Sequence, residues 1–251
     1  MVAAFADISL LQLALVAGVA LLASVLGGVA GYGTGALMPL VLVPIVGPEP
    51  AVPIIALAGL LTNTSRAAAF VRFIDRRRVL LVLAGAVLPC ILSAYGYTLL
   101  TGKGAMLVIG TMLMLTVPLR YVFKRRAVAF GDGGLVAGAA GYGAAVGGTV
   151  GAGVILLSLL MAAGLEGAAV IATDAVISVA IGLVRLVVFG AAGVIGAQVV
   201  AFALLIGIVA FPGAFLARAF VARMPLHVHS AILDAVVLIG GAVMMVGALR
   251  R

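Results

Sequence analysis

Residues 27–35 read GGVAGYGTG in one-letter code, and they lie inside an apolar run that continues on both sides. Glycine at this density weakens a helix, because it loses more backbone entropy on folding than other residues. In a lipid bilayer, an interrupted helix is tolerated only where protein buries the backbone or where the backbone lines a cavity. The stretch therefore predicts either a tight helix-packing surface or the edge of a binding site.

The composition predicts a membrane protein. Of the 251 residues, 66% are hydrophobic and 9% are charged, whereas roughly 25% of the residues of a soluble domain are charged. A spanning helix needs about 20 apolar residues, so the chain predicts an all-α, polytopic helical membrane protein with one transmembrane domain, residues 1–251. The net charge of +8 comes from basic clusters between apolar runs, which is typical of cytoplasmic loops and not of nucleic-acid binding. Cys90 is the only cysteine, which excludes an internal disulfide.

Apolar segments follow one another with short connections. We expect them at residues 9–29, 36–46, 51–73, 79–100 and 105–123, and again at 133–146, 154–163, 167–189, 193–216 and 231–249. Pro39 and Pro44 predict an irregular conformation for 36–46. We expect turns at 47–50 and 101–104, and the basic clusters 72–78 and 124–126 on the cytoplasmic side. No basic residue precedes Arg66, so we expect no cleavable signal peptide.

The glycine stretch recurs. Residues 147–153 read GGTVGAG, so the pattern G-x-x-G-x-G that begins at Gly28 begins again at Gly148, an offset of 120 residues. Further along, Arg66 aligns with Arg185 at an offset of 119 residues. We expect two repeats, about 9–126 and 132–251. The loop after Arg66 is basic and the loop after Arg185 is uncharged, which favours inverted repeats with broken helices, as in secondary transporters.

Two arginines lie inside apolar spans, where a charge is costly and marks a functional site by default. On the same helical faces lie Thr62 and Asn63 beside Arg66, and Ser178 and Asp174 beside Arg185. A guanidinium group binds two oxygens of an oxyanion at once. We therefore expect an anion-binding centre between the repeats, although each arginine could instead reach toward the membrane interface.

The other polar residues allow more than one interpretation. Asp174 is either the counter-ion of an arginine or a protonatable group that couples transport to a proton gradient. The glycines either pack helices together or line the site. We expect Gly31, Gly33, Gly151 and Gly153 to line it, with backbone N–H donors at the helix breaks.

Several residues are expected outside the site. Tyrosines in membrane proteins are most often interface anchors, so Tyr32 and Tyr142 are not assigned to it. The acidic residues Asp132 and Asp234 suit the first turn of a helix. His227 and His229 are expected in a loop, without a third ligand, so no metal site and no cofactor is predicted.

With its two glycine motifs, the chain resembles the TauE/SafE family of sulfite exporters over nearly its whole length. The first motif is residues 31–35, GYGTG, followed by Pro39, and the second is residues 151–153, GAG, without a following proline. The resemblance implies a multi-pass permease of the bacterial inner membrane that moves small anions such as sulfite or small organosulfonates. It also implies an inverted-repeat helical fold.

The favoured hypothesis is a secondary transporter that exports a small sulfur-containing anion, sulfite or an organosulfonate such as sulfoacetate, by alternating access coupled to the proton gradient. Its partners are then the small anion and the lipid bilayer, and a homo-oligomer is left open. A channel or carrier for another solute, such as a metal cation, would need acidic or thioether residues at the centre, where only Asp174 qualifies. A non-transport membrane protein, such as an assembly factor, is the third hypothesis; an enzyme is not expected, because no nucleophile–base pair is evident.

Overall fold

The computed structural model describes residues 5, 8–30, 33–125, 130–213, 215–216 and 226–249. Within these residues the regular structure is helical and includes no β-strand, which confirms the predicted all-α class. The elements are α1 (Leu10–Ala30), α2 (Gly33–Val46), α3 (Pro48–Ala69), the 3₁₀ helix η2 (Val71–Phe73), α4 (Arg76–Thr98), α5 (Gly102–Arg125), α6 (Asp132–Gly148), α7 (Gly153–Ala162), α8 (Gly167–Ala191), α9 (Ala197–Ala210) and α11 (Leu226–Leu249).

The apolar helices have the lengths and the exposed faces of a membrane protein. In the described part of the chain, α4, α8 and residues Gly102–Leu119 of α5 are each long and apolar enough to cross a bilayer. One face of α4 exposes Leu80, Leu88 and Leu92, an apolar surface that suits contact with lipid. The protein is therefore a polytopic helical membrane protein.

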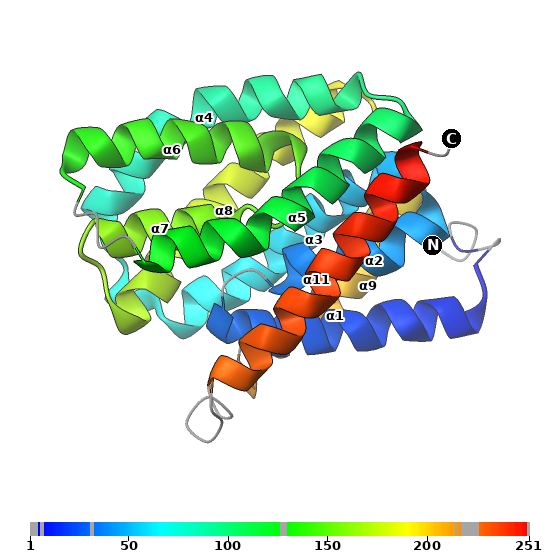
Figure 1. Ribbon diagram of the computed structural model, residues 1–251, viewed down its shortest axis with the longest axis horizontal. Coiled ribbons are helices and arrows are strands. Elements are labelled where there is room, and N and C mark those ends of the chain that lie inside the picture. Colours follow the sequence, from blue (N-terminus) through cyan, green and yellow to red (C-terminus); the bar gives the residue numbers. More distant parts are fainter. Residues whose placement is uncertain are drawn as a thin grey trace.

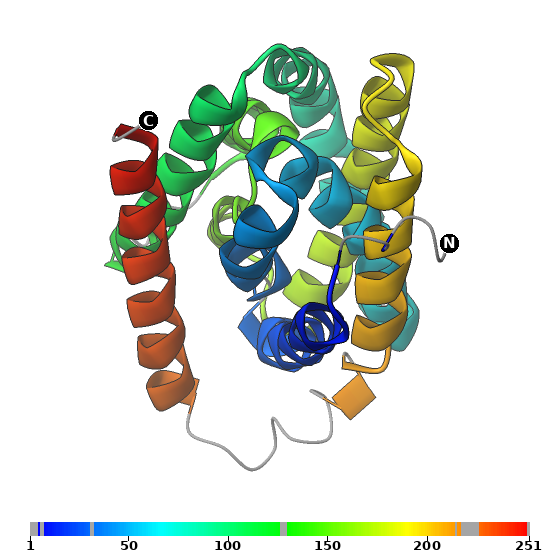
Figure 2. The ribbon, with the colours of Figure 1, turned by 90° about the vertical axis from the view of Figure 1, so that its right-hand side faces the viewer.

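The two halves of the chain interlock. Helix α4 of the first half packs along α6 and α8 of the second, and α9 of the second half packs along α1 and α3 of the first. Figure 1 shows α4 beside α6 at the top of the bundle, with α1 at the bottom. Helices α3 and α8 pack against each other, as do α5 and α11, and Figure 2 shows α11 and α9 on opposite flanks of the bundle. The fourth helix of each half thus belongs to the bundle of the other half.

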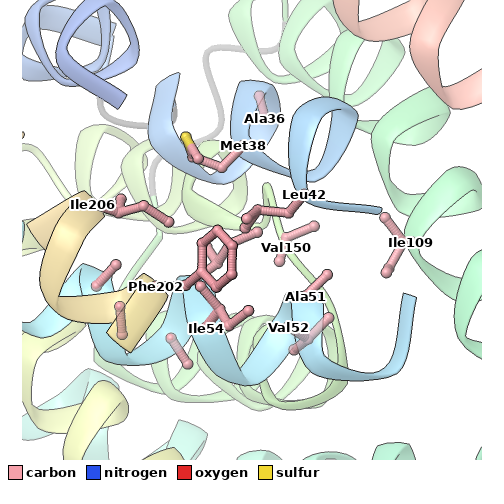
Figure 3. Packing of buried hydrophobic residues seen from close by; sticks show 14 of the residues in the cluster. Ala36, Met38, Leu42, Ala51, Val52, Ile54, Ile109, Val150, Phe202 and Ile206 are labelled. Carbon is pink, nitrogen blue, oxygen red and sulfur yellow. The ribbon is translucent and has the colours of Figure 1, made fainter. Parts of the chain in front are cut away.

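The apolar interior follows this exchange. We call α1, α2, α3 and α9 the first body, and α4, α6, α7 and α8 the second body. In the first body, the ring of Phe202 from α9 lies among Met38 and Leu42 of α2 and Ile54 of α3 (Figure 3). Val150, from the second glycine stretch, reaches into the same cluster. A separate buried cluster holds the second body together, with members such as Val82, Leu135, Leu156 and Ile177.

The first three segments differ from the predicted boundaries. Helix α2 runs from Gly33 through Pro39 and Pro44 without a break, so the predicted irregularity is wrong. Each proline removes a single N–H donor, and in an apolar environment the remaining helical bonds are the best available partners. The turn expected at 47–50 reduces to Gly47, because Pro48 already begins α3, where a missing N–H costs nothing. Helix α3 ends at Ala69, and η2 replaces its predicted last turn.

The predicted span 193–216 is wrong, because α9 covers only Ala197–Ala210. Carbonyl groups at the end of a helix need partners when they are buried. Here the Ser24 hydroxyl donates to the Ala210 carbonyl at 2.6 Å, and the Ser65 hydroxyl donates to the Phe211 carbonyl at 2.8 Å. Two serines from other helices therefore allow α9 to end inside the protein.

Other boundaries shift by a few residues. Helix α5 begins at Gly102, inside the turn expected at 101–104. Helix α11 begins at Leu226, so His227 and His229 belong to a helix and not to a loop. Asp132 is the first residue of α6, as expected, whereas Asp234 lies well inside α11 and is not in its first turn.

Small residues set the close packing of α4 on α6, which run in the same direction. A Cβ atom added to Gly143 would collide with the backbone carbonyl of Ala86, and one added to Gly85 would collide with the carbonyl of Val136. At Gly147 a Cβ would meet the carbonyl of Cys90. The packing interpretation of the glycines is confirmed for this interface, where backbones approach as they do in small-residue contacts between membrane helices.

We expect Gly143→Ala to destabilise the protein, because the new methyl group would push α6 away from the backbone of α4. Gly141→Ala on the same helix is the matched control, since a Cβ at Gly141 meets nothing within 4 Å. Alanine there should be neutral or slightly stabilising. Melting temperatures in detergent check both variants, and equal melting temperatures for the two would contradict this account of the interface.

Candidate functional site

A cavity of about 130 Å³ lies where α3 and α8 meet the two glycine stretches. Its lining residues come from α1, α2, α3, α6, α7 and α8, with the residues between α6 and α7. The polar side chains among them are those of Ser24, Thr34, Thr62, Asn63, Arg66, Tyr142, Thr149, Ser178 and Arg185. Arg66 and Arg185 have the only charged side chains among the described lining residues. The cavity thus brings together both halves of the chain around two cations.

Helices α3 and α8 line the cavity with corresponding positions. Residues 59, 62, 63 and 66 of α3 and residues 178, 181, 182 and 185 of α8 all line it, and each pair is separated by the offset of 119 residues found in the sequence. The pairs are Gly59 with Ser178, Thr62 with Ile181, Asn63 with Gly182, and Arg66 with Arg185. Arginine is thus the one polar residue that both helices carry at matching positions.

Arg66 is paired with a buried carboxylate. Its Nη2 donates to Asp174 Oδ2 at 2.5 Å, and its Nη1 donates to Asn63 Oδ1 at 2.9 Å. The side chains of Arg66 and Asp174 are 9% and 1% exposed. Because Arg66 belongs to α3 and Asp174 to α8, this ion pair joins the two bodies across the cavity. Asp174 therefore has the position of a counter-ion of an arginine, which is one of its two interpretations.

Arg185 has only neutral partners. Its Nη2 donates to the backbone carbonyl of Thr149 at 3.2 Å, and its guanidinium carbon lies 5.6 Å from the ring centre of Phe189. Among the described residues, no carboxylate oxygen lies within 4.0 Å of its nitrogen atoms. Its Nε is buried and without a hydrogen-bond partner. A buried guanidinium group with unused N–H donors is suited to bind an oxyanion.

The glycine stretches meet at this cavity. A Cβ atom on Gly35 would lie 3.0 Å from the backbone nitrogen of Gly151, so the first turn of α2 lies against the second glycine stretch. Gly151 has a φ of +83°, which disfavours any side chain. Just beyond it, α7 begins with Ala152 as an N-cap that makes no side-chain capping bond. The first-turn N–H groups of α7 are therefore oriented to bind a negative charge.

The structure brings most of the predicted site residues to one place. The cavity lining includes Arg66, Arg185, Thr62, Asn63, Ser178, Gly151 and Gly153. Asp174 is not a lining residue, but it accepts a hydrogen bond from Arg66. Gly33 is the first residue of α2, and Thr34 and Gly35, which follow it, line the cavity. Gly31 and Tyr32 lie outside the described residues.

Among the polar side chains of the lining, sequence reasoning missed four: Ser24, Thr34, Tyr142 and Thr149. The interface-anchor interpretation of Tyr142 is wrong, because its side chain is among the largest that are fully buried. The signal in the sequence for a lining role was the position of Tyr142 shortly before the second glycine stretch. Within the described residues, no group of three His, Cys, Asp or Glu side chains is placed to hold a metal ion.

The family model described as sulfite exporter TauE/SafE matches residues 16–244, nearly the whole chain. The chain belongs to the TauE/SafE sulfite exporter family. As a TauE/SafE protein, it is an integral membrane transporter of sulfite or related anions. No curated protein and no solved structure matches the chain. In this TauE/SafE member, the matched region includes α3 and α8 with both arginines.

We expect Asp174→Leu to lower the free energy of unfolding by about 3–5 kcal/mol, because removing one partner leaves a buried charge uncompensated. The double variant Arg66→Met/Asp174→Leu should recover most of that loss, since it removes both charges. Denaturant unfolding in detergent measures the difference.

Asp132 provides the control for this measurement. It pairs with Arg77 and Arg78, but its side chain is 43% exposed. Asp132→Ala should therefore cost only about 0–1 kcal/mol. A similar cost for the Asp132 and Asp174 variants would contradict the role assigned to the buried pair.

Proposed function

We propose that the cavity between α3 and α8 is the substrate site of a secondary transporter that exports sulfite or a small organosulfonate. The observation that carries the proposal is the pair of arginines, Arg66 and Arg185, which line one cavity from matching positions of the two halves. Thr62, Asn63 and Ser178 would add neutral donors, and the start of α2 at residues 33–35 and the break at 151–153 would add backbone N–H groups. The site is complete within one chain, so the proposal requires no second copy.

The two halves are proposed to be inverted repeats, 9–126 and 132–251. Support comes from the helix contacts. If α1–α5 correspond in order to α6, α7, α8, α9 and α11, then α4 corresponds to α9. The packing of α4 on α6 and α8 then corresponds to the packing of α9 on α1 and α3. If each of the five helices named for each half crosses once, the second half would enter the bilayer from the opposite side. A substrate site between inverted repeats near the midplane is typical of secondary transporters.

Alternating access would then move the first body against the second. The cavity lies between these bodies, with Arg66 and the first glycine stretch on one side and Arg185 and the second on the other. Because α4 and α9 are exchanged between the halves, the moving units are the two bodies and not the two halves of the sequence. The Arg66–Asp174 pair bridges them, so a proton on Asp174 would weaken the bridge and couple the motion to a proton gradient.

The protein is proposed to lie in the bacterial inner membrane with the η2–α4 turn in the cytoplasm. Arg72 and residues 76–78 lie at that turn, and Arg77 and Arg78 contact Asp132 at the start of α6. The end of α5, which precedes α6 and includes Lys124 and Arg125, therefore lies at the same end of the bundle. Two basic clusters on one side agree with the positive-inside rule.

Flux measurements in proteoliposomes test the function. The wild-type protein should move labelled sulfite without ATP, and Arg185→Ala should reduce the flux to the protein-free background while the protein still melts cooperatively. Arg72→Ala is a suitable control, because Arg72 lies in η2 away from the cavity lining. Background flux of the wild-type protein with sulfite and every organosulfonate tried would refute the proposal, and would favour a non-transport role. Flux of labelled divalent cations instead would favour the cation carrier.

A further inference from the structure

We infer that the cavity carries a single uncompensated positive charge, supplied by Arg185, and that it selects singly charged oxyanions over doubly charged ones. The inference rests on the proposed function, because it names the charge of the substrate that the same site takes. Hydrogensulfite and simple alkanesulfonates have the required charge. Sulfate and sulfoacetate, with two charges at neutral pH, do not.

The charge of the cavity follows from its ion pairs. Among the described residues, two arginines and no acidic side chain line it, which would suggest two positive charges. However, Asp174 contacts Arg66 at 2.5 Å, and both side chains are buried, so this pair is neutral as a unit. Arg185 contacts a carbonyl group and an aromatic ring, which orient a cation without cancelling its charge. One net positive charge is left for a ligand.

The asymmetry has a sequence origin. The residue that corresponds to Asp174 in the first half, at the offset of 119 residues, is Ile55. Ile55 lines the cavity and is 7% exposed. The first half therefore places an apolar side chain where the second half places the carboxylate. Consequently, the matching arginines of the two halves have different partners, and only one of them keeps its charge for the substrate.

Burial makes the charge count decisive. A buried ion that is not neutralised is strongly disfavoured, because the low-polarity interior does not replace its hydration. A singly charged anion cancels the charge of Arg185, whereas a doubly charged anion leaves one negative charge uncompensated. Arg66 can still donate hydrogen bonds to the ligand, but its charge is already balanced by Asp174.

Binding of two probe anions to the purified protein at one neutral pH tests the inference. Methanesulfonate carries one charge and sulfate carries two, and calorimetry or thermal shift gives their dissociation constants. The wild-type protein should bind methanesulfonate at least about tenfold more tightly than sulfate. Asp174→Asn should shift this preference toward sulfate by about tenfold or more, because it adds one net positive charge to the cavity.

A rescue experiment distinguishes Arg66 from Arg185. Arg66→Gln alone should abolish methanesulfonate binding, because Asp174 then cancels the charge of Arg185. Adding Asp174→Asn to it restores one net positive charge, so the double variant should bind methanesulfonate within about tenfold of the wild-type protein. Ile55→Asp should abolish binding and Ile55→Asn should not, because only the carboxylate would neutralise Arg185.

These variants remain informative even if Asp174→Asn does not fold, because the double variant and the Ile55 pair test the same charge count. An unchanged preference in a folded Asp174→Asn variant would overturn the inference. So would a folded double variant that does not bind methanesulfonate, since the charge for the substrate would then come from Arg66. In either case, binding by the wild-type protein would leave the proposed function intact. A wild-type protein that binds neither these anions nor sulfite would refute the proposed function itself.

Discussion

The structure depends on the contact between Gly35, near the start of α2, and Gly151, just before α7. Irregular backbone in a bilayer has to be enclosed by protein, and the backbone at Gly151 lies against α2. A side chain at Gly35 would push α2 away from Gly151, and the positive φ of Gly151 disfavours any side chain there. Both glycines line the cavity, and this contact places the start of α7 at its edge.

The buried charges are arranged around this centre. Arg66 and Asp174 balance each other across the two bodies, whereas Arg185 binds to the carbonyl group that ends α6. A positive charge at a helix C-terminus is favoured by the helix dipole, which helps to hold Arg185 in place without a carboxylate. The halves of the chain thus have a similar framework and different electrostatics. The two arginines at matching sequence positions therefore have different charge environments beside the cavity.

The interlocked packing determines how the cavity can open. If each half of the sequence formed its own bundle, the halves could move as independent units. Instead, α4 packs on α6 and α8, and α9 packs on α1 and α3. One buried apolar cluster lies within the second body and α5, whereas the other extends from the first body to Tyr97 of α4 and Phe189 of α8. Close glycine contacts between α4 and α6 bind the second body into one unit. The proposed motion between the bodies would keep these contacts and would rearrange those between α3 and α8.

The sequence by itself determined the membrane class, the approximate helices and the two arginines of the cavity lining, with three of its neutral polar residues. Long apolar runs leave few alternatives to helices, because a bilayer offers no partners for unpaired backbone groups. The repeated Arg66 and Arg185 could be found from their shared offset, since a costly buried charge is seldom duplicated without a use.

Only the tertiary structure decided which partner each of these residues has. The sequence places Asp174 on the same helix as Arg185, yet the carboxylate reaches across to Arg66 on α3. The end of α9 likewise depends on Ser24 and Ser65, which come from distant parts of the chain. Tyr142 became a lining residue because α6 packs its face against α4 and turns that side chain inward. Periodicity reports which residues share a face of a helix, but the pairing of charges and the capping of helix ends are set by contacts between helices.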